Sequence, residues 1–88
     1  MNLEFTPQAF EDLHWLARNE PRLLKRLVKL LDDVRRSPFE GLGKPEPLRG
    51  DLSGWWSRRI DGEHRLVYRV IGDADIRRVQ IAQCRYHY

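Results

Sequence analysis

Residues 55–71, with the sequence WWSRRIDGEHRLVYRVI, decide the fold of this chain. Two runs rich in β-branched and aromatic residues, 55–60 and 63–71, flank the dipeptide Asp61-Gly62. Because Asp-Gly between two such runs is a strong hairpin signal, the stretch predicts two antiparallel strands.

Alternation within this hairpin separates two faces of the predicted sheet. In the second run, one face carries Leu66, Tyr68 and Val70 and the other carries Arg65, Val67 and Arg69. We expect the first face to pack on helices and the opposite face to be cationic. The first run splits in the same way, with Arg58 and Arg59 on opposite faces, and leaves open the side to which each tryptophan points.

The residues before the hairpin predict a short strand and two helices. Residues 1–5 alternate apolar and polar side chains, and Thr6-Pro7 is typical of a helix N-cap followed by the first helical residue. A second helix is expected from Pro21 to Arg36. The expected apolar stripes are Phe10, Leu13, Leu16 and Ala17, then Leu23, Leu24, Leu27, Val28, Leu30, Leu31 and Val34.

The segment 37–48 separates the helices from the hairpin. Its three prolines and two glycines exclude a regular helix or a central strand, so we expect an ordered, exposed loop. Residues 76–84 predict a further strand. Helices followed by a strand meander indicate an α+β fold, with two N-terminal helices on one face of a mainly antiparallel sheet, in a single domain over residues 1–88.

Composition narrows the class of protein. The chain has 88 residues and a net charge of +3, and 13 of its 16 basic residues are arginine, which suits contacts with a polyanion. Arginine enrichment from a GC-rich genome is the alternative. The single Cys84 excludes an intramolecular disulfide, and the three histidines lack metal-ligand spacing. No apolar run approaches the roughly 20 residues of a membrane span, so a cytoplasmic protein is expected.

A few polar residues occupy positions suited to chemistry. Glu46 is mounted rigidly between two prolines, and His87 near the end of the chain suits proton transfer near neutral pH. The alternatives are a solvated loop acid and a frayed terminus. His64 is expected to be a satisfied, semi-buried histidine, and His14 to be structural or exposed. The candidates for a polyanion-binding face, or for an ordinary charged strand surface, are Arg49, Arg58, Arg59 and Arg65.

Four motifs make the sequence recognisable. They are PFEGLGKPEPL at 38–48, LSGWWSRRI at 52–60, EHRLVY at 63–68 and CRYHY at 84–88. In this order and spacing they resemble the YoeB-type toxins of the RelE/ParE superfamily, which are ribosome-dependent mRNA interferases of toxin–antitoxin pairs. The resemblance covers essentially the whole chain, although residues 72–80 follow no family motif.

The resemblance implies a role for individual residues. Glu46 matches the general base, Arg65 the phosphate-stabilising group and His87 the general acid. Tyr88 matches a residue that positions the substrate. Arg59 matches a further phosphate contact, and Lys44 and Arg49 are additional candidates for RNA or phosphate binding. Position 49 departs from better-known members, which tend to carry lysine there, so the charge is kept while its geometry changes.

The function implied is that of an endoribonuclease that needs neither a metal nor another cofactor. It would cleave mRNA in the ribosomal A site through attack by the RNA 2′-hydroxyl. The implied partners are a YefM/Phd-like antitoxin, the 70S ribosome with its mRNA, and a second copy in a homodimer, with no membrane and no DNA except through the antitoxin complex. The alternatives are a non-catalytic ParE-like binding toxin and a basic RNA- or ribosome-binding module.

Overall fold

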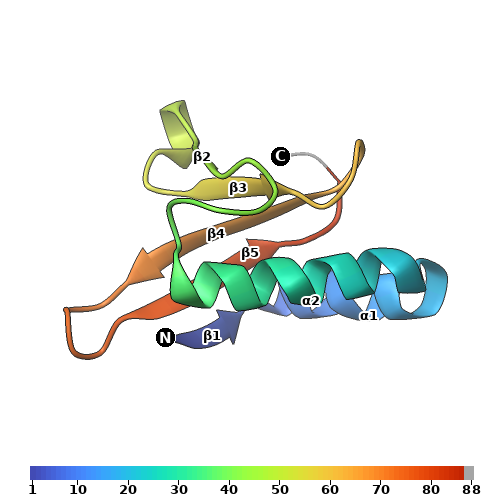
Figure 1. Ribbon diagram of the computed structural model, residues 1–88, viewed down its shortest axis with the longest axis horizontal. Helices are drawn as coiled ribbons and strands as arrows, with labels where there is room; N and C mark the ends of the chain where they lie inside the picture. Colours follow the sequence, from blue (N-terminus) through green and yellow to red (C-terminus); the bar gives the residue numbers. More distant parts are fainter. Residues whose placement is uncertain (87–88) are drawn as a thin grey trace.

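The computed structural model describes residues 1–86 and confirms the α+β architecture (Figure 1). Two helices and a five-stranded sheet make up the described part of the chain, with a short 3-10 helix, η1, between β2 and β3. The elements are β1 (Asn2–Phe5), α1 (Pro7–Asn19), α2 (Pro21–Arg36), β2 (Glu46–Pro47), η1 (Gly50–Leu52), β3 (Trp56–Arg59), β4 (Arg65–Ile71) and β5 (Arg78–Gln83).

The sheet has the strand order β1-β5-β4-β3-β2. Its neighbours are antiparallel except β1 and β5, which run parallel. The predicted hairpin is confirmed, because Trp56 pairs with Tyr68 and Arg59 with Arg65 across β3 and β4. Both helices lie on one side of this sheet (Figure 1). Within residues 1–86, neither helix has the length and apolar content needed to cross a membrane.

The helices begin where the sequence predicts. The Thr6 side chain accepts a hydrogen bond from the Ala9 N–H at 3.1 Å, and Pro7 is the first residue of α1. Pro21 starts α2 in the same way. The expected apolar stripes are wrong at three positions, because Phe10, Ala17 and Val28 are exposed. The side of α1 that faces the sheet carries Ala9, Asp12 and Leu16 instead.

The core lies between the helices and the near face of the sheet. It is lined by Leu27, Leu30, Leu31 and Val34 of α2 and by Leu66, Tyr68, Val79 and Ile81 of the strands. The structure also resolves the orientation of the two adjacent tryptophans. Trp56 packs against the core, whereas Trp55 lies on the other side, with the Arg69 guanidinium 4.4 Å from the centre of its ring.

Arg58 is fully buried on the helix side, so its predicted place in a polyanion-binding face is wrong. The reason is its register: Arg58 pairs with Leu66, which points into the core. Burying this guanidinium is tolerable because every one of its nitrogens has an acceptor. The acceptors are Tyr68 Oη (3.0 Å), Asp33 Oδ2 (2.5 Å) and the backbone oxygens of Leu42 (3.1 Å), Ser37 (2.6 Å) and Glu40 (2.9 Å).

These bonds fix the segment between α2 and β2 as an ordered loop. The carboxylate of Asp33 also accepts the Leu42 N–H at 2.9 Å, and this bond, with that from Arg58, lowers the pKa of Asp33. Gly43 has φ +79°, and its carbonyl accepts the Arg59 N–H at 2.7 Å. The loop thereby delivers β2, which pairs with β3 as an edge strand, where a proline is accommodated.

Candidate functional site

The sheet face opposite the helices, called the outer face here, gathers three of the predicted site residues. Glu46 on β2 pairs with Ser57 on β3, and Arg59, two residues further along, pairs with Arg65 on β4. Directly paired residues project from the same side of a sheet, as do residues two apart in one strand. Glu46, Arg59 and Arg65 therefore share the outer face.

The spacing of these residues suits a ligand the size of one phosphodiester linkage. Strands lie about 4.8 Å apart and rise about 3.3 Å per residue, which puts the Cα atoms of Glu46 and Arg65 about 12 Å apart. Both side chains are long, so their charged ends can approach one group from two sides. Arg59 stands on the strand between them.

The Arg65 side chain is half-buried and is held by the hairpin loop. Its Nη1 donates to the backbone oxygens of Asp61 at 2.6 Å and of His64 at 3.1 Å. Burial raises the pKa of the Asp61 carboxyl, but hydrogen bonds from the His64 and Glu63 N–H groups outweigh this, so the net shift is downward. The Asp61 carboxylate thus stabilises the hairpin loop, and backbone oxygens of the loop hold the Arg65 guanidinium.

The other predicted cations lie at the surface around β2. Lys44 precedes Glu46 by two residues and has φ +54°, and Arg49 directly precedes η1. Glu46, Arg59, Lys44 and Arg49 are all exposed. The outer face is therefore open to a large polyanion.

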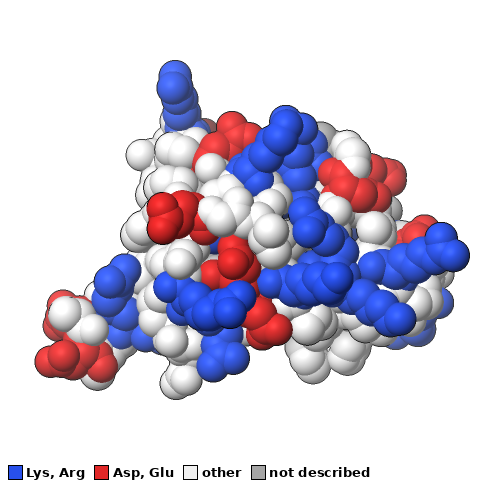
Figure 2. All heavy atoms as spheres, viewed as in Figure 1, with Lys and Arg blue, Asp and Glu red and all other residues white. Residues whose placement is uncertain are grey.

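Basic charge is not confined to the outer face. Figure 2 shows Lys and Arg side chains spread over the helix side of the molecule, particularly along α2. The exposed basic residues of α2 are Arg22, Lys25, Lys29, Arg35 and Arg36. The molecule thus has a second basic surface that the strand pattern did not predict.

The C-terminal segment contacts the hairpin as far as the structure describes it. The Tyr86 carbonyl accepts the Arg65 N–H at 3.0 Å, and the Tyr86 N–H donates to His64 Nδ1 at 2.7 Å. The predicted site residues His87 and Tyr88 lie outside the described residues. The last described residue is accordingly bound beside Arg65.

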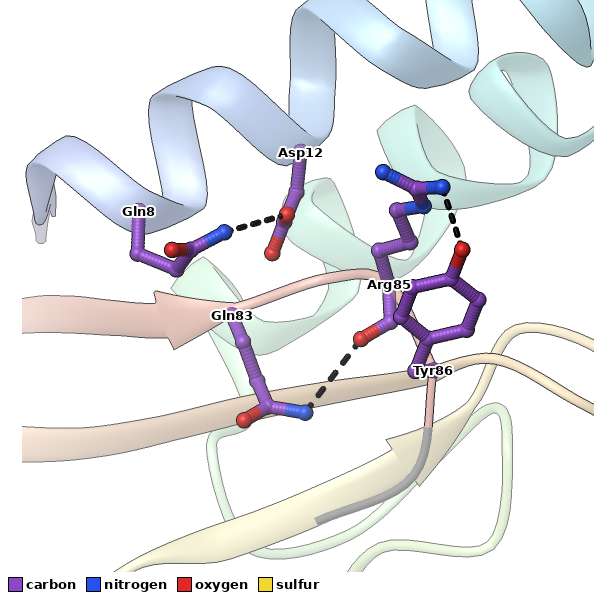
Figure 3. A pocket seen from close by; sticks show the side chains of 5 residues that line it. All are labelled: Gln8, Asp12, Gln83, Arg85 and Tyr86. Atoms are coloured by element: carbon purple, nitrogen blue, oxygen red, sulfur yellow. Dashed lines mark hydrogen bonds between the residues drawn. The ribbon is translucent and has the colours of Figure 1, made fainter.

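A hollow of about 210 Å³ adjoins this segment. Figure 3 shows its lining residues, Gln8, Asp12, Gln83, Arg85 and Tyr86, between α1 and the end of β5. Asp12 is buried and accepts hydrogen bonds from Gln8 Nε2 (2.9 Å) and from the Cys84 N–H (3.1 Å). Burial, with the charge of Asp12, raises the pKa of the Cys84 thiol to about 12.

The sequence did not single out Asp12. The only signal in the sequence is an acidic residue on the side of α1 that faces the sheet. An acidic side chain in a helix is equally typical of a solvent-exposed position, so the signal does not indicate a buried carboxylate.

His64 and His14 lie as the sequence predicts. His64 is buried with an acceptor role for its ring, and His14 is exposed on α1 beside the Phe10 ring. Among residues 1–86, no group of three or more His, Cys, Asp and Glu side chains is placed to hold a metal ion.

Comparisons with known proteins agree with the motifs. The family described as YoeB-like toxin of bacterial type II toxin-antitoxin system matches residues 5–88. Toxin YoeB of Streptomyces coelicolor is 51% identical over 89 residues, which covers 100% of both chains.

Solved structures give the same result. A YoeB/ParE toxin from Agrobacterium tumefaciens superposes with a TM-score of 0.94 at 45% identity, over 100% of both chains. A YoeB dimer from Staphylococcus aureus matches with a TM-score of 0.87 at 44% identity, and the toxin in a heterotetrameric YoeB-YefM complex from the same organism with 0.85 at 45%. Both matches cover 100% of this chain and 98% of the other. The chain therefore belongs to the YoeB family of toxins of bacterial type II toxin–antitoxin systems.

Proposed function

We propose that this toxin is an endoribonuclease that cuts mRNA in the ribosomal A site and thereby stops translation. The observation that carries the proposal is that β2, β3 and β4 present Glu46, Arg59 and Arg65 on one face. Cleavage of RNA by its own 2′-hydroxyl needs a base beside that hydroxyl and positive charge beside the phosphate. A carboxylate and two guanidinium groups on neighbouring strands meet both needs.

The proposed reaction is an internal transesterification. Glu46 takes the proton from the 2′-hydroxyl, and the oxygen attacks the adjacent phosphorus. The bond from phosphorus to the 5′-oxygen breaks, and His87, as an imidazolium, gives that oxygen a proton. Tyr88 positions the substrate. The products are a 2′,3′-cyclic phosphate and a 5′-hydroxyl end, and the step uses neither a metal nor another cofactor.

Arg65 is suited to stabilise the crowded phosphate because it is already in place. Two backbone oxygens of the hairpin loop hold its Nη1, and a guanidinium has further N–H donors to offer. A donor that is fixed before the reaction needs no reorganisation as charge develops on the phosphate oxygens. Arg59 adds a second cation, and the exposed Lys44 and Arg49 extend the positive field that attracts RNA.

The openness of this site supports a dependence on the ribosome. Glu46 and Arg59 are exposed, so residues 1–86 alone enclose no substrate. Ribosomal RNA would hold the message in line with these groups, an alignment worth up to about 7–11 kcal/mol in well-oriented systems. The basic surface of α2 suits a contact with ribosomal RNA (Figure 2).

Regulation follows from the family. A toxin of this kind must be neutralised in the cell that makes it, and the related Staphylococcus aureus toxin is seen in a complex with YefM and as a dimer. We propose a YefM/Phd-like antitoxin with an acidic segment that covers the outer face, together with a homodimer. On this proposal the toxin acts in the cytoplasm, free of membranes, and meets DNA only through the antitoxin complex.

The test is single-turnover cleavage of mRNA on programmed ribosomes. Glu46→Gln keeps the shape of the side chain and removes the base, so we expect the rate to fall roughly 10²–10⁴-fold. Asp51→Asn is the matched control, because Asp51 is exposed close to β2 but belongs to η1, and its rate should be unchanged. A message with a 2′-deoxynucleotide at the cleavage point should stay intact.

Three outcomes would contradict parts of this proposal. Full cleavage and full toxicity of both Glu46→Gln and Arg65→Ala would rule out the mechanism. Toxicity with intact mRNA would support a ParE-like binding toxin or a basic RNA- or ribosome-binding module. Cleavage of free RNA as fast as ribosome-bound message would rule out the need for the ribosome.

A further inference from the structure

We propose that His64 is a positioning residue that holds the C-terminal tail, meaning residues 85 and 86 here, beside Arg65. The proposal rests on the proposed function, because it gives a purpose to the tail that carries His87. It concerns a side chain that is 3% exposed and therefore touches no substrate.

His64 and Arg65, which are consecutive in the chain, bind the two polar backbone groups of Tyr86. His64 Nδ1 accepts the Tyr86 N–H at 2.7 Å, and the Arg65 N–H donates to the Tyr86 carbonyl at 3.0 Å. The second bond leads directly to the residue proposed to stabilise the phosphate. The position of Tyr86 is thus tied to that of Arg65.

The backbone of Tyr86 shows that these bonds impose a conformation. Tyr86 has φ +63°, a left-handed conformation that is uncommon for a residue with a bulky side chain. Such a conformation persists only where several contacts from the surrounding structure hold it. Conformations of this kind cluster at functional sites. The bonds from His64 and Arg65 are the two backbone constraints that determine it here.

Aromatic contacts add to the backbone bonds. The His64 ring lies 5.9 Å from the Trp15 ring of α1 and 5.5 Å from the Tyr86 ring. The Arg85 guanidinium carbon lies 3.7 Å from the centre of the Trp15 ring and 4.3 Å from that of Tyr86, and the guanidinium donates to the Tyr86 hydroxyl. Figure 3 shows Arg85 reaching toward α1 with the Tyr86 ring beside it. The tail is therefore attached to both layers of the fold.

The chemistry of histidine explains why this position needs more than an apolar ring. A ring that accepts at Nδ1 carries its proton on Nε2, and here Nε2 faces Glu63 Oε1 at 3.6 Å. The Asp61 carboxylate accepts hydrogen bonds from the backbone N–H groups of both Glu63 and His64. These bonds fix the backbone that carries the His64 ring. An apolar side chain would fill the space but leave the Tyr86 N–H without its acceptor.

The pair His64→Asn and His64→Leu tests this proposal, since the two side chains have nearly the same shape. The Asn oxygen can stand where Nδ1 stands, whereas Leu offers no acceptor. We expect His64→Leu to lose protection of the Tyr86 amide against hydrogen exchange, measured by NMR on the full chain. We expect His64→Asn to retain most of that protection.

Cleavage kinetics on ribosomes give the second measurement. A misplaced tail should lower the single-turnover rate at saturating ribosomes by about 10- to 100-fold in His64→Leu, with the half-saturating concentration unchanged. His64→Asn should stay within a few-fold of the unmodified protein. His64→Gln is the second variant, in case His64→Leu does not fold. It keeps a polar side chain, but its polar atoms lie one bond further from the backbone than Nδ1 does. We therefore expect it to behave like the Leu variant.

The outcomes separate this proposal from the proposed function. Unchanged exchange of the Tyr86 amide in His64→Leu or His64→Gln overturns the role of His64, whatever the rates. Equal rate losses in His64→Asn and His64→Leu overturn it as well. Loss of protection in the Leu variant, in a toxin that cuts no RNA even when unmodified, supports the role of His64 in holding the tail and overturns the nuclease.

Discussion

Arg58 and Arg59 are adjacent in the sequence and opposite in what they do. Arg58 is fully buried on the helix side, and each of its guanidinium nitrogens donates to an acceptor in the core or in the loop after α2. Arg59 is exposed on the outer face, where it stands between Glu46 and Arg65. One arginine holds the structure together and the other is available to a substrate.

The difference shows that residue type alone does not predict function in this sheet. Alternation sets the two side chains on opposite faces, and what each face meets decides their roles. The buried arginine still serves the site, because it fixes the loop that carries Gly43 and leads to β2. The loop in turn contacts the exposed arginine, because the Gly43 carbonyl accepts the Arg59 N–H.

The largest effect on stability is expected from Arg58→Ala. The variant removes a fully buried guanidinium from its partly buried partner Asp33, and breaking a buried pair in this way costs about 3–5 kcal/mol. Here the loss includes the bonds to the loop backbone as well as that to Asp33. Urea unfolding measures the change, and a loss below about 1 kcal/mol would show that the network contributes little.

The converse effect is expected from Arg59→Ala. An exposed substitution should change the free energy of unfolding by no more than about 0.5 kcal/mol. The single-turnover rate on ribosomes should fall roughly 10²–10³-fold, the range seen when one donor to a developing charge is removed. An Arg59→Ala protein that cuts normally would mean that the outer face binds RNA elsewhere.

Much of the fold follows from local patterns. The hairpin signal at Asp61-Gly62, the Thr6-Pro7 cap and the Pro21 restart correspond to the observed β3–β4 hairpin and to the first residues of both helices. The misassigned apolar positions lie on the helices, where the sheet-facing side of α1 includes a buried Asp12. Its partners lie on α1 itself and at Cys84, and the second contact arises only from tertiary structure.

The candidate site could be predicted in part for the same reason. Alternation set Arg58 and Arg59 on opposite faces but left open which of them shares the face of Arg65. The pairing of β3 with β4 assigns Arg59 to that face, and the pairing of β2 with β3 adds Glu46. The burial of Arg58 depends on backbone oxygens of the loop after α2, and no local pattern shows where those point. The contact of His64 with the tail joins residues 22 apart in the chain, which the sequence pattern did not connect.

Gly43 lies where the surroundings of Arg58 and Arg59 meet, so Gly43→Ala tests both at once. A Cβ on Gly43 would lie 2.9 Å from Leu30 Cδ2, 3.0 Å from the Arg59 oxygen and 3.2 Å from Arg58 Cβ, at a φ of +79°. Strain and crowding together should cost about 2–4 kcal/mol, measured by urea unfolding.

Gly50→Ala is the matched control for Gly43→Ala. Gly50 has a similar φ of +65°, but nothing lies within 4 Å of its added Cβ. The control should therefore show only the conformational cost, about 1–2 kcal/mol. Equal losses in the two variants would mean that the contact between Gly43 and the two arginines is loose.

Asp33→Asn is expected to cost somewhat less stability than Gly43→Ala, and its effect depends on pH. Hydrogen bonds from Leu42 and Arg58 lower the pKa of Asp33 below its ordinary value of 3.8 in the folded protein. A group with a lowered folded pKa stabilises the protein above the unfolded pKa and loses that contribution as the pH falls through the folded value. At pH 7 the variant should be less stable by about 1.5–3 kcal/mol, the range for a hydrogen bond to a charged group.

This gap should shrink in urea unfolding as the pH falls below 3.8, because protonation then removes the same charge from the unmodified protein. Asp32→Asn is the control, since Asp32 is the exposed neighbour and should change stability by less than about 0.5 kcal/mol. A gap that stays constant with pH would assign the loss to the NH2 group of Asn, which replaces an acceptor oxygen by a donor, and not to the charge. The buried arginine would then be held by its backbone acceptors and Tyr68 without help from the charge of Asp33.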